Sequence, residues 1–199
     1  MQIYIILDTS GSMEGAKIGA LNDCMSNIII DLQEKAIRGN NLELAVLEFS
    51  RNANWMHPKP LPIQDFDWKE LLANGMTSLG RACTTLSAGL NEFANQEDDI
   101  VTILLSDGCP TDDYDEGISI LQQNKFFKQS ENYAIALGED ADIPSLLRFT
   151  DTDEHIYKID KIDEMLSILQ DMIERKTKSA NPIQTICQNS SNDSDDEWD

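Results

Sequence analysis

Short apolar runs alternate with helical patterns along most of this chain, and the alternation restricts the possible folds more than any other feature. Residues 3–7 are continuously apolar, and residues 100–105 are apolar except for Thr102, as expected for parallel strands that are covered on both faces. Between these runs, Leu21, Met25 and Ile28 recur at spacings of three and four residues, as on one face of a helix. The pattern predicts an α/β fold: a Rossmann-like, doubly wound, mostly parallel central sheet with helices on both faces.

The remaining elements are expected from the same alternation. Strands are predicted at residues 41–49, 133–137 and 155–159, an antiparallel edge strand at 53–56, and helices at 79–93, 117–123, 143–148 and 162–175. We expect residues 1–178 to form one domain. The polar and acidic residues 179–199 are expected to form a disordered C-terminal tail.

The chain is strongly acidic, with 15 Lys and Arg against 36 Asp and Glu and a formal net charge of −21. Proteins that bind nucleic acid or an anionic membrane surface usually present a basic patch, and the sequence has none of adequate size. No apolar stretch reaches the roughly 18 residues of a membrane span, and the run at 3–7 is too short for a secretory signal. The 4 cysteines form no C-x-x-C pair and are expected to be free thiols. We therefore expect a cytoplasmic protein without nucleic-acid or membrane partners.

Oxygen-bearing side chains gather where three segments of the predicted sheet end. The first strand is followed by DTSGS, which places one carboxylate and two hydroxyls at alternate positions: Asp8, Ser10 and Ser12. Thr77 precedes a predicted helix, and Asp107 follows the apolar strand at 100–105. Open α/β sheets bind ligands at the carboxyl ends of their strands, and Mg²⁺ prefers oxygen ligands. These five side chains are therefore candidate metal ligands.

This set resembles the metal-ion-dependent adhesion site (MIDAS) of von Willebrand factor A (vWA) domains, and the similarity covers roughly residues 1–176. The resemblance implies that Ser10, Ser12 and Thr77 touch a divalent cation directly, while Asp8 and Asp107 often act through water. The cation would be Mg²⁺, with Mn²⁺ and Ca²⁺ as alternatives. The resemblance also implies an open coordination position that accepts an Asp or Glu carboxylate of a protein partner.

Within the vWA family, residues 6–13, 75–80 and 105–112 are most similar to bacterial cytoplasmic proteins of the tellurite-resistance TerY type. Such proteins are associated with a PPM-type phosphatase and a Ser/Thr-type kinase in stress-response or phage-defence gene clusters. The resemblance implies a non-enzymatic, metal-dependent protein–protein interaction module, with the kinase or the phosphatase as candidate partner.

Two other functions stay open. A metal-dependent phosphohydrolase could use Asp8 as nucleophile or ligand, but Ser10 stands where a second carboxylate is wanted. The nearest basic residue, Lys17, is expected on a helix surface. The other alternative is a structural scaffold domain in which the metal only ties loops together.

Several further residues have both functional and ordinary interpretations. The acidic run at 112–116 can form a rim around the metal loop or cap the next helix. The pair Trp55–Met56 can form an exposed patch for a partner or pack the edge strand. We expect His57 and His155 at ordinary positions. An acidic residue of 193–199 could reach the metal, although a charge run is usually a solvated tail.

Overall fold

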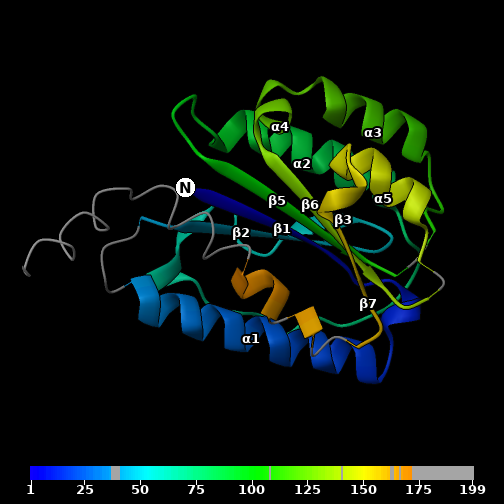
Figure 1. The fold of residues 1–199 in the computed structure, drawn as a ribbon, viewed down its shortest axis with the longest axis horizontal. Helices are drawn as coiled ribbons and strands as arrows, with labels where there is room; N and C mark the ends of the chain where they lie inside the picture. Colours follow the sequence, from blue (N-terminus) through cyan, green and yellow to red (C-terminus); the bar gives the residue numbers. More distant parts are fainter. Residues whose placement is uncertain (37–40, 108, 140, 162–163, 166, 172–199) are drawn as a thin grey trace, which may run out of the picture.

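A mostly parallel sheet forms the centre of the computed structural model, which describes residues 1–36, 41–107, 109–139, 141–161, 164–165 and 167–171 (Figure 1). In the described residues the sheet has 7 strands in the order β3-β2-β1-β5-β6-β7, and β4 also pairs with β2. The parallel strands are β1 (Gln2–Asp8), β2 (Glu43–Phe49), β5 (Ile100–Ser106), β6 (Glu131–Leu137) and β7 (Ile156–Ile159). Two short strands, β3 (Ala53–Trp55) and β4 (Leu61–Pro62), run antiparallel to β2 at the edge.

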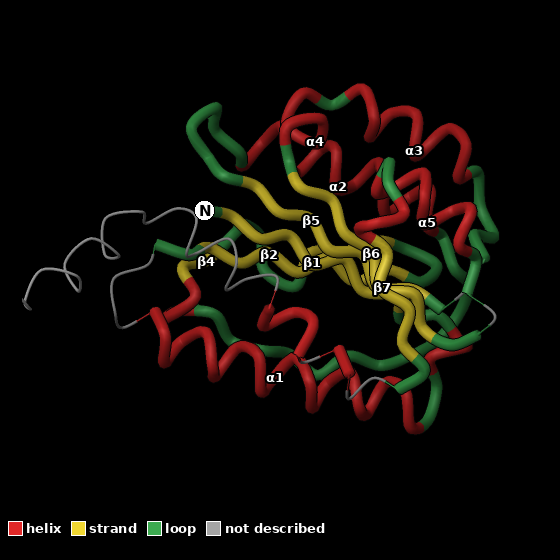
Figure 2. Tube along the Cα trace, viewed as in Figure 1, coloured by secondary structure: helices red, strands yellow, loops and turns green. Residues whose placement is uncertain are grey.

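Helices cover both faces of this sheet (Figures 1 and 2). The long helix α1 (Ala16–Ala36) lies on one face. The other face carries α2 (Leu79–Phe93), α3 (Tyr114–Gln123), α4 (Lys125–Gln129) and α5 (Ile143–Thr150). Single 3₁₀ turns lie at Gly11–Met13, Ile63–Asp65 and Asp153–His155. The prediction of a doubly wound, mostly parallel α/β fold is confirmed.

Strand β1 has a buried side chain at every position because both of its faces are covered. Ile3 and Ile5 pack in the core on the α1 side, while Tyr4 and Ile6 pack in the core beneath α2. Successive side chains of a strand point to opposite faces, so a continuously apolar strand serves two cores at once. The strand is therefore packed on both of its faces along its whole length.

The observed elements differ from the predicted ones mainly at their ends. Helix α4 was not predicted, because its single short turn depends on Asn124, whose side chain accepts hydrogen bonds from the backbone N–H groups of Phe126 and Phe127. The short strand β4 was also not predicted; it contains Pro62, which an edge strand tolerates because no N–H is needed on its outer side.

The end of the chain is described only in part. Residues 164, 165 and 167–171 are helical, and Met165 and Leu169 are buried in the core on the α1 side. The predicted start of this helix at residue 162, its end at 175 and the predicted tail lie outside the described residues.

The pair Trp55–Met56 at the edge strand packs inward, so the packing interpretation is confirmed. The Trp55 ring lies 6.1 Å from that of Tyr4 and 6.0 Å from that of Phe93, centroid to centroid. Met56 is buried. Neither residue offers an exposed patch to a partner.

The described cysteines Cys24, Cys83 and Cys109 form no disulfide bond, as predicted, and Cys187 lies outside the described residues. Within the part of the chain that the structure describes, no helix is long and apolar enough to span a membrane.

Candidate metal centre

The candidate site lies at the carboxyl ends of the neighbouring strands β1 and β5. These strands are parallel and pair Leu7 with Leu105, so the next residues, Asp8 and Ser106, come side by side. The Ser106 hydroxyl donates a hydrogen bond of 2.6 Å to Oδ2 of Asp8. The sheet register therefore brings together two positions that are far apart in the sequence.

Asp8 is a fully buried carboxylate, with 0% of its surface exposed. Its Oδ1 accepts a 2.9 Å hydrogen bond from the backbone N–H of Ser10, and its Oδ2 accepts the bond from Ser106. Burial raises the pKa of the Asp8 carboxyl, although the hydrogen bonds from Ser10 and Ser106 act in the opposite direction. Both donors are neutral, so a nearby cation would compensate a charge that the described residues leave unpaired.

A chain of hydrogen bonds continues from Asp8 to Asp107. The hydroxyls of Ser10 and Ser12 are 3.0 Å apart, and the Ser12 hydroxyl donates to Oδ1 of Asp107 at 2.6 Å. The turn between the serines is held by Gly11, whose N–H donates to the carbonyl of Gly75 at 3.1 Å. Four of the five predicted ligands thus form one connected group.

Asp107 also binds Lys17, which lies at the exposed surface of α1 as expected. The Lys17 ammonium donates to Oδ2 of Asp107 and forms an ion pair with it. The Asp107 side chain is only 2% exposed, whereas that of Lys17 is 46% exposed. Lys17 lies in the first turn of α1, so the helix start directs its ammonium back over the strand ends.

The fifth candidate, Thr77, lies in the neighbouring loop. Its N–H donates to the Thr111 hydroxyl at 3.1 Å, and its carbonyl accepts from the N–H of Thr111 at 2.9 Å. The loop is tied to the serine turn through the contact between Gly11 and Gly75. Among the described residues, no hydrogen bond joins the Thr77 hydroxyl to the other four candidates.

The acidic run after Asp107 acts mainly through helix capping, as the ordinary interpretation proposed. Asp113 is the N-cap of α3 and accepts a 3.1 Å hydrogen bond from Glu116 N–H. Asp112 instead accepts from the N–H groups of Gly80 and Arg81, at 3.0 and 2.9 Å, at the start of α2. It therefore caps a helix that precedes it by about thirty residues, which local sequence patterns do not reveal.

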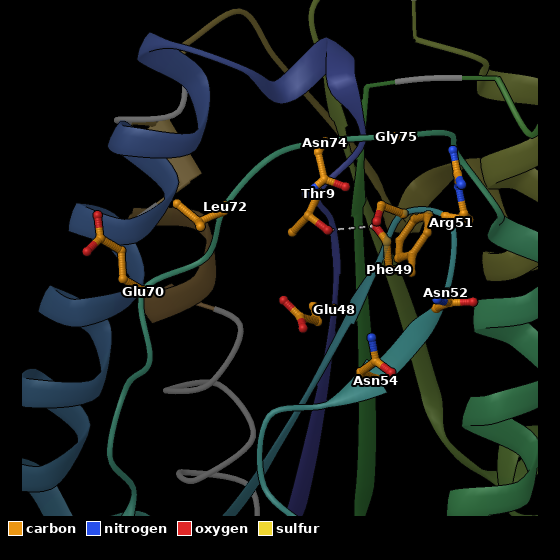
Figure 3. A pocket seen from close by; sticks show the side chains of 11 residues that line it. Thr9, Glu48, Phe49, Arg51, Asn52, Asn54, Glu70, Leu72, Asn74 and Gly75 are labelled. Atoms are coloured by element: carbon orange, nitrogen blue, oxygen red, sulfur yellow. Dashed lines mark hydrogen bonds between the residues drawn. The ribbon is translucent and has the colours of Figure 1, made fainter.

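A polar cleft of about 720 Å³ lies beside the candidate ligands (Figure 3). Its lining includes Thr9 and Gly75, which belong to the two loops just described. In Figure 3, Glu48 extends from β2 into the space between the sheet and the segment that carries Glu70 and Leu72. Burial raises the pKa of the Glu48 carboxyl. No pattern in the sequence predicted this cleft, although Glu48 is the one charged residue in the second half of an apolar strand.

The histidines lie apart from this group. His57 contacts the carbonyl of Asp67 at 2.7 Å, and His155 contacts the carbonyl of Asn132 at 3.1 Å. Both positions agree with the ordinary structural role that was expected of them.

The donor set fits a hard cation. It consists of carboxylate and hydroxyl oxygens, which Mg²⁺, Mn²⁺ and Ca²⁺ prefer. Among the described residues, no group of three or more His, Cys, Asp or Glu side chains is placed to hold a metal ion. A cation at this site would therefore depend on Ser10, Ser12 and Thr77 hydroxyls, and on water, as well as on the two aspartates.

Comparisons with known proteins agree with the fold. Residues 2–175 match the family model described as von Willebrand factor type A domain. No individual curated protein matches the chain.

Three similar solved structures illustrate the likeness. A von Willebrand factor type A protein from Catenulispora acidiphila is 20% identical, with a TM-score of 0.66 over 86% of this chain and 41% of that one. The ArnB paralog VWA2 from Sulfolobus acidocaldarius is 22% identical, with a TM-score of 0.63 over 84% of this chain and 43% of that one. Proximal thread matrix protein 1 from the mussel byssus, with a zinc-occupied MIDAS motif, is 18% identical, with a TM-score of 0.63 over 88% and 45%. The chain thus spans less than half of each, and at these identities the likeness concerns the fold.

Proposed function

This chain belongs to the von Willebrand factor type A domain family, and from that premise we propose that it is a metal-dependent protein–protein interaction module. A divalent cation held by Asp8, Ser10, Ser12, Thr77 and Asp107 would capture a carboxylate of a partner protein. The observation that carries this proposal is the connected group of Asp8, both serines and Asp107 at the ends of β1 and β5.

The charges at the site suit such a role. Two carboxylates balance a divalent cation, so a third carboxylate from a partner can approach without a large net negative charge. The neutral hydroxyls of Ser10 and Ser12 leave the cation electrophilic. Mg²⁺ is the proposed ion, with Mn²⁺ and Ca²⁺ as alternatives, because the site offers only oxygen donors. The zinc of the mussel protein is a property of that protein.

The polar cleft offers a place for the neighbours of the captured carboxylate. The chain as a whole carries a net charge of −21 and repels acidic surfaces. A partner whose acidic residue is flanked by Lys or Arg would reduce this repulsion. Glu48 and Glu70 in the cleft are suitably placed to meet such basic side chains.

The biological setting is proposed from the sequence resemblance alone. Residues 6–13, 75–80 and 105–112 are similar to TerY-type proteins, so we propose a bacterial cytoplasmic role in stress response or phage defence. The candidate partners are the kinase and the PPM-type phosphatase of such gene clusters.

A non-enzymatic role is proposed over phosphate hydrolysis. Lys17 does supply a basic group near Asp107, which the sequence analysis found lacking. Asp8, however, lies fully buried beneath hydrogen bonds from Ser10 and Ser106, and a nucleophile needs access to its substrate. Hydrolysis of a generic aryl phosphate with Mg²⁺, abolished by Asp8→Asn, would support the enzyme instead.

The test is affinity capture of partners by this chain, with millimolar Mg²⁺ or with EDTA. Native lysate is used in one experiment, and the purified candidate kinase and phosphatase are used in another. We expect binding only with Mg²⁺, and its loss in Thr77→Ala. Ser119→Ala is the matched control, because it removes an exposed hydroxyl on α3 outside the site. Equal capture in EDTA would instead favour the scaffold alternative, in which the metal only ties loops together.

A further inference from the structure

Lys17 is placed where a cation would act, and we propose that its ammonium competes with the divalent cation for Asp107 and thereby sets the metal affinity of the site. The inference rests on the proposed metal site and concerns its regulation. It starts from a contact of the chain itself, the ion pair between Lys17 and Asp107.

Both carboxylate oxygens of Asp107 are engaged by this chain. Oδ1 accepts from the Ser12 hydroxyl at 2.6 Å, and Oδ2 accepts from the Lys17 ammonium. The Asp107 side chain is almost completely buried, so it has little further surface for another ligand. A cation that draws on Asp107, directly or through a water molecule, must therefore share this carboxylate with Lys17 or displace it.

The two bonds to Asp107 differ in how easily they adapt. A hydroxyl such as that of Ser12 can rotate its proton away and offer a lone pair to a cation while staying in place. An ammonium has three donors and no acceptor, so Lys17 can only repel a cation that approaches the same oxygen. Ser12 is thus compatible with a bound cation, and Lys17 is its competitor.

The Lys17 side chain can move away from Asp107. Nearly half of its side chain is exposed, and a lysine has a long, flexible stem. It lies in the first turn of α1, which contains no acidic residue, and a positive charge is unfavourable at a helix N-terminus. The attraction of Asp107 is therefore the main force that holds the ammonium over the site.

Competition has a functional consequence. The ammonium neutralises one of the two carboxylates, so it lowers the electrostatic gain from a divalent cation and raises the concentration at which the cation binds. Once displaced, the ammonium remains close to the strand ends and can attract an approaching partner carboxylate. Lys17 would thereby raise the metal concentration that partner capture requires.

The test compares Lys17→Met with Lys35→Met. Both changes remove one lysine charge from α1, but Lys35 pairs with Asp31 near the other end of the helix. Isothermal titration with Mg²⁺ and with Mn²⁺, at one pH and ionic strength, gives the affinities. We expect Lys17→Met to bind each ion about three- to tenfold more tightly than the unchanged chain, as expected from the loss of a close charge pair. Lys35→Met should stay within about twofold, because distant charges are screened.

A second measurement separates competition from simple damage. In EDTA, Lys17→Met should melt at a lower temperature than the unchanged chain, and the rise on adding Mg²⁺ should be larger. Lys17→Gln provides a polar replacement if the Met variant does not fold, and it should show the same increase in affinity.

The outcomes distinguish this inference from the metal site itself. Equal or weaker metal binding by folded Lys17→Met and Lys17→Gln, while Lys35→Met and the unchanged chain bind normally, overturns the competition alone. Weaker binding would mean that Lys17 positions Asp107 for the cation. If neither the unchanged chain nor either Lys17 variant binds metal, the proposed site and this inference both fail. Binding by the Lys17 variants alone would support complete blocking by the ammonium.

Discussion

Strands β1 and β5 each have an apolar middle and a polar carboxyl end. These two regions adjoin in the chain, yet their side chains have opposite chemistry. In the middle, Ile5, Ile103 and Leu104 are at most 1% exposed and contact apolar side chains on both faces. At the ends, Asp8 and Ser106 are equally buried but polar, and they depend on hydrogen bonds. One pair of strands thus has a part that stabilises the fold and a part that carries the candidate site.

This difference between the middles and the ends of the strands indicates how a buried polar site is supported by the fold. A buried carboxylate whose hydrogen-bond donors are neutral is unfavourable for stability, and the raised pKa of Asp8, caused mainly by burial, expresses this. Such a group persists only where the surrounding structure is strongly held, and the doubly covered strands supply that support. Changes in the middle should therefore affect stability, and changes at the ends should affect binding.

The largest expected effect comes from the middle of β5. Leu104→Ala should lower the free energy of unfolding by about 2–5 kcal/mol, because it leaves a cavity in a fully buried strand. The measurement is urea denaturation followed by circular dichroism. The metal affinity of the folded protein should not change, and a loss below about 1 kcal/mol would contradict the central place of this strand.

The next largest effect is expected at the end of β1, where a substitution should change metal affinity and not lower stability. Asp8→Asn should weaken Mg²⁺ binding by roughly a hundredfold, equivalent to about 2.7 kcal/mol, because a neutral amide replaces a carboxylate near the cation. In EDTA the same variant should be at least as stable as the unchanged chain, since the buried charge is gone. Calorimetric titration measures the Mg²⁺ affinity, and thermal melting in EDTA measures the stability. Asp113→Asn, at a helix cap, serves as the control. A large loss of stability in EDTA would show that the charge of Asp8 supports the fold.

Ser106 joins the two regions, so its removal should produce an intermediate result. Ser106→Ala removes the 2.6 Å hydrogen bond to Asp8 and should lower both the free energy of unfolding, by about 1–2 kcal/mol, and the metal affinity. Urea denaturation and calorimetric titration on the same preparation measure both quantities. If only one of these two quantities changes, Ser106 belongs to a single region. It then serves either the part of β5 that stabilises the fold or the part that forms the site, and does not join the two.

The smallest effect is expected at Glu48, beyond the ligands. The folded-state pKa of Glu48 is raised by burial, so its protonated form is favoured by folding and stability declines as the pH rises above 4.5, the ordinary pKa of Glu. Glu48→Gln should flatten this decline without changing Mg²⁺ affinity. Melting temperatures between about pH 4 and 7 measure the effect, with Glu43→Gln at the other end of β2 as control. An unchanged pH profile would contradict the assigned burial effect.

The apolar middles and the polar ends of β1 and β5 could largely be predicted from the sequence, because each produces a recognisable local pattern. The apolar runs predicted the strand middles, and the alternating oxygen groups after residue 7 predicted the group that Asp8, Ser10 and Ser12 form with Asp107. The ion pair of Lys17 could not be predicted, since a helix pattern does not say where a long side chain ends. The cleft between Glu48 and Glu70 was also missed, because it forms only when separate segments fold together.

The central claim is that a divalent cation binds at the ends of β1 and β5, and anomalous diffraction from crystals soaked in Mn²⁺ tests it most directly. We expect one strong anomalous peak within about 2.0–2.3 Å of the Ser10 and Ser12 hydroxyl oxygens, close to Thr77 and both aspartates. The Lys17 ammonium should have moved away from Asp107 in the same map. A peak elsewhere, or none at millimolar Mn²⁺ in well-ordered crystals, would show that the ends of β1 and β5 do not hold a divalent cation.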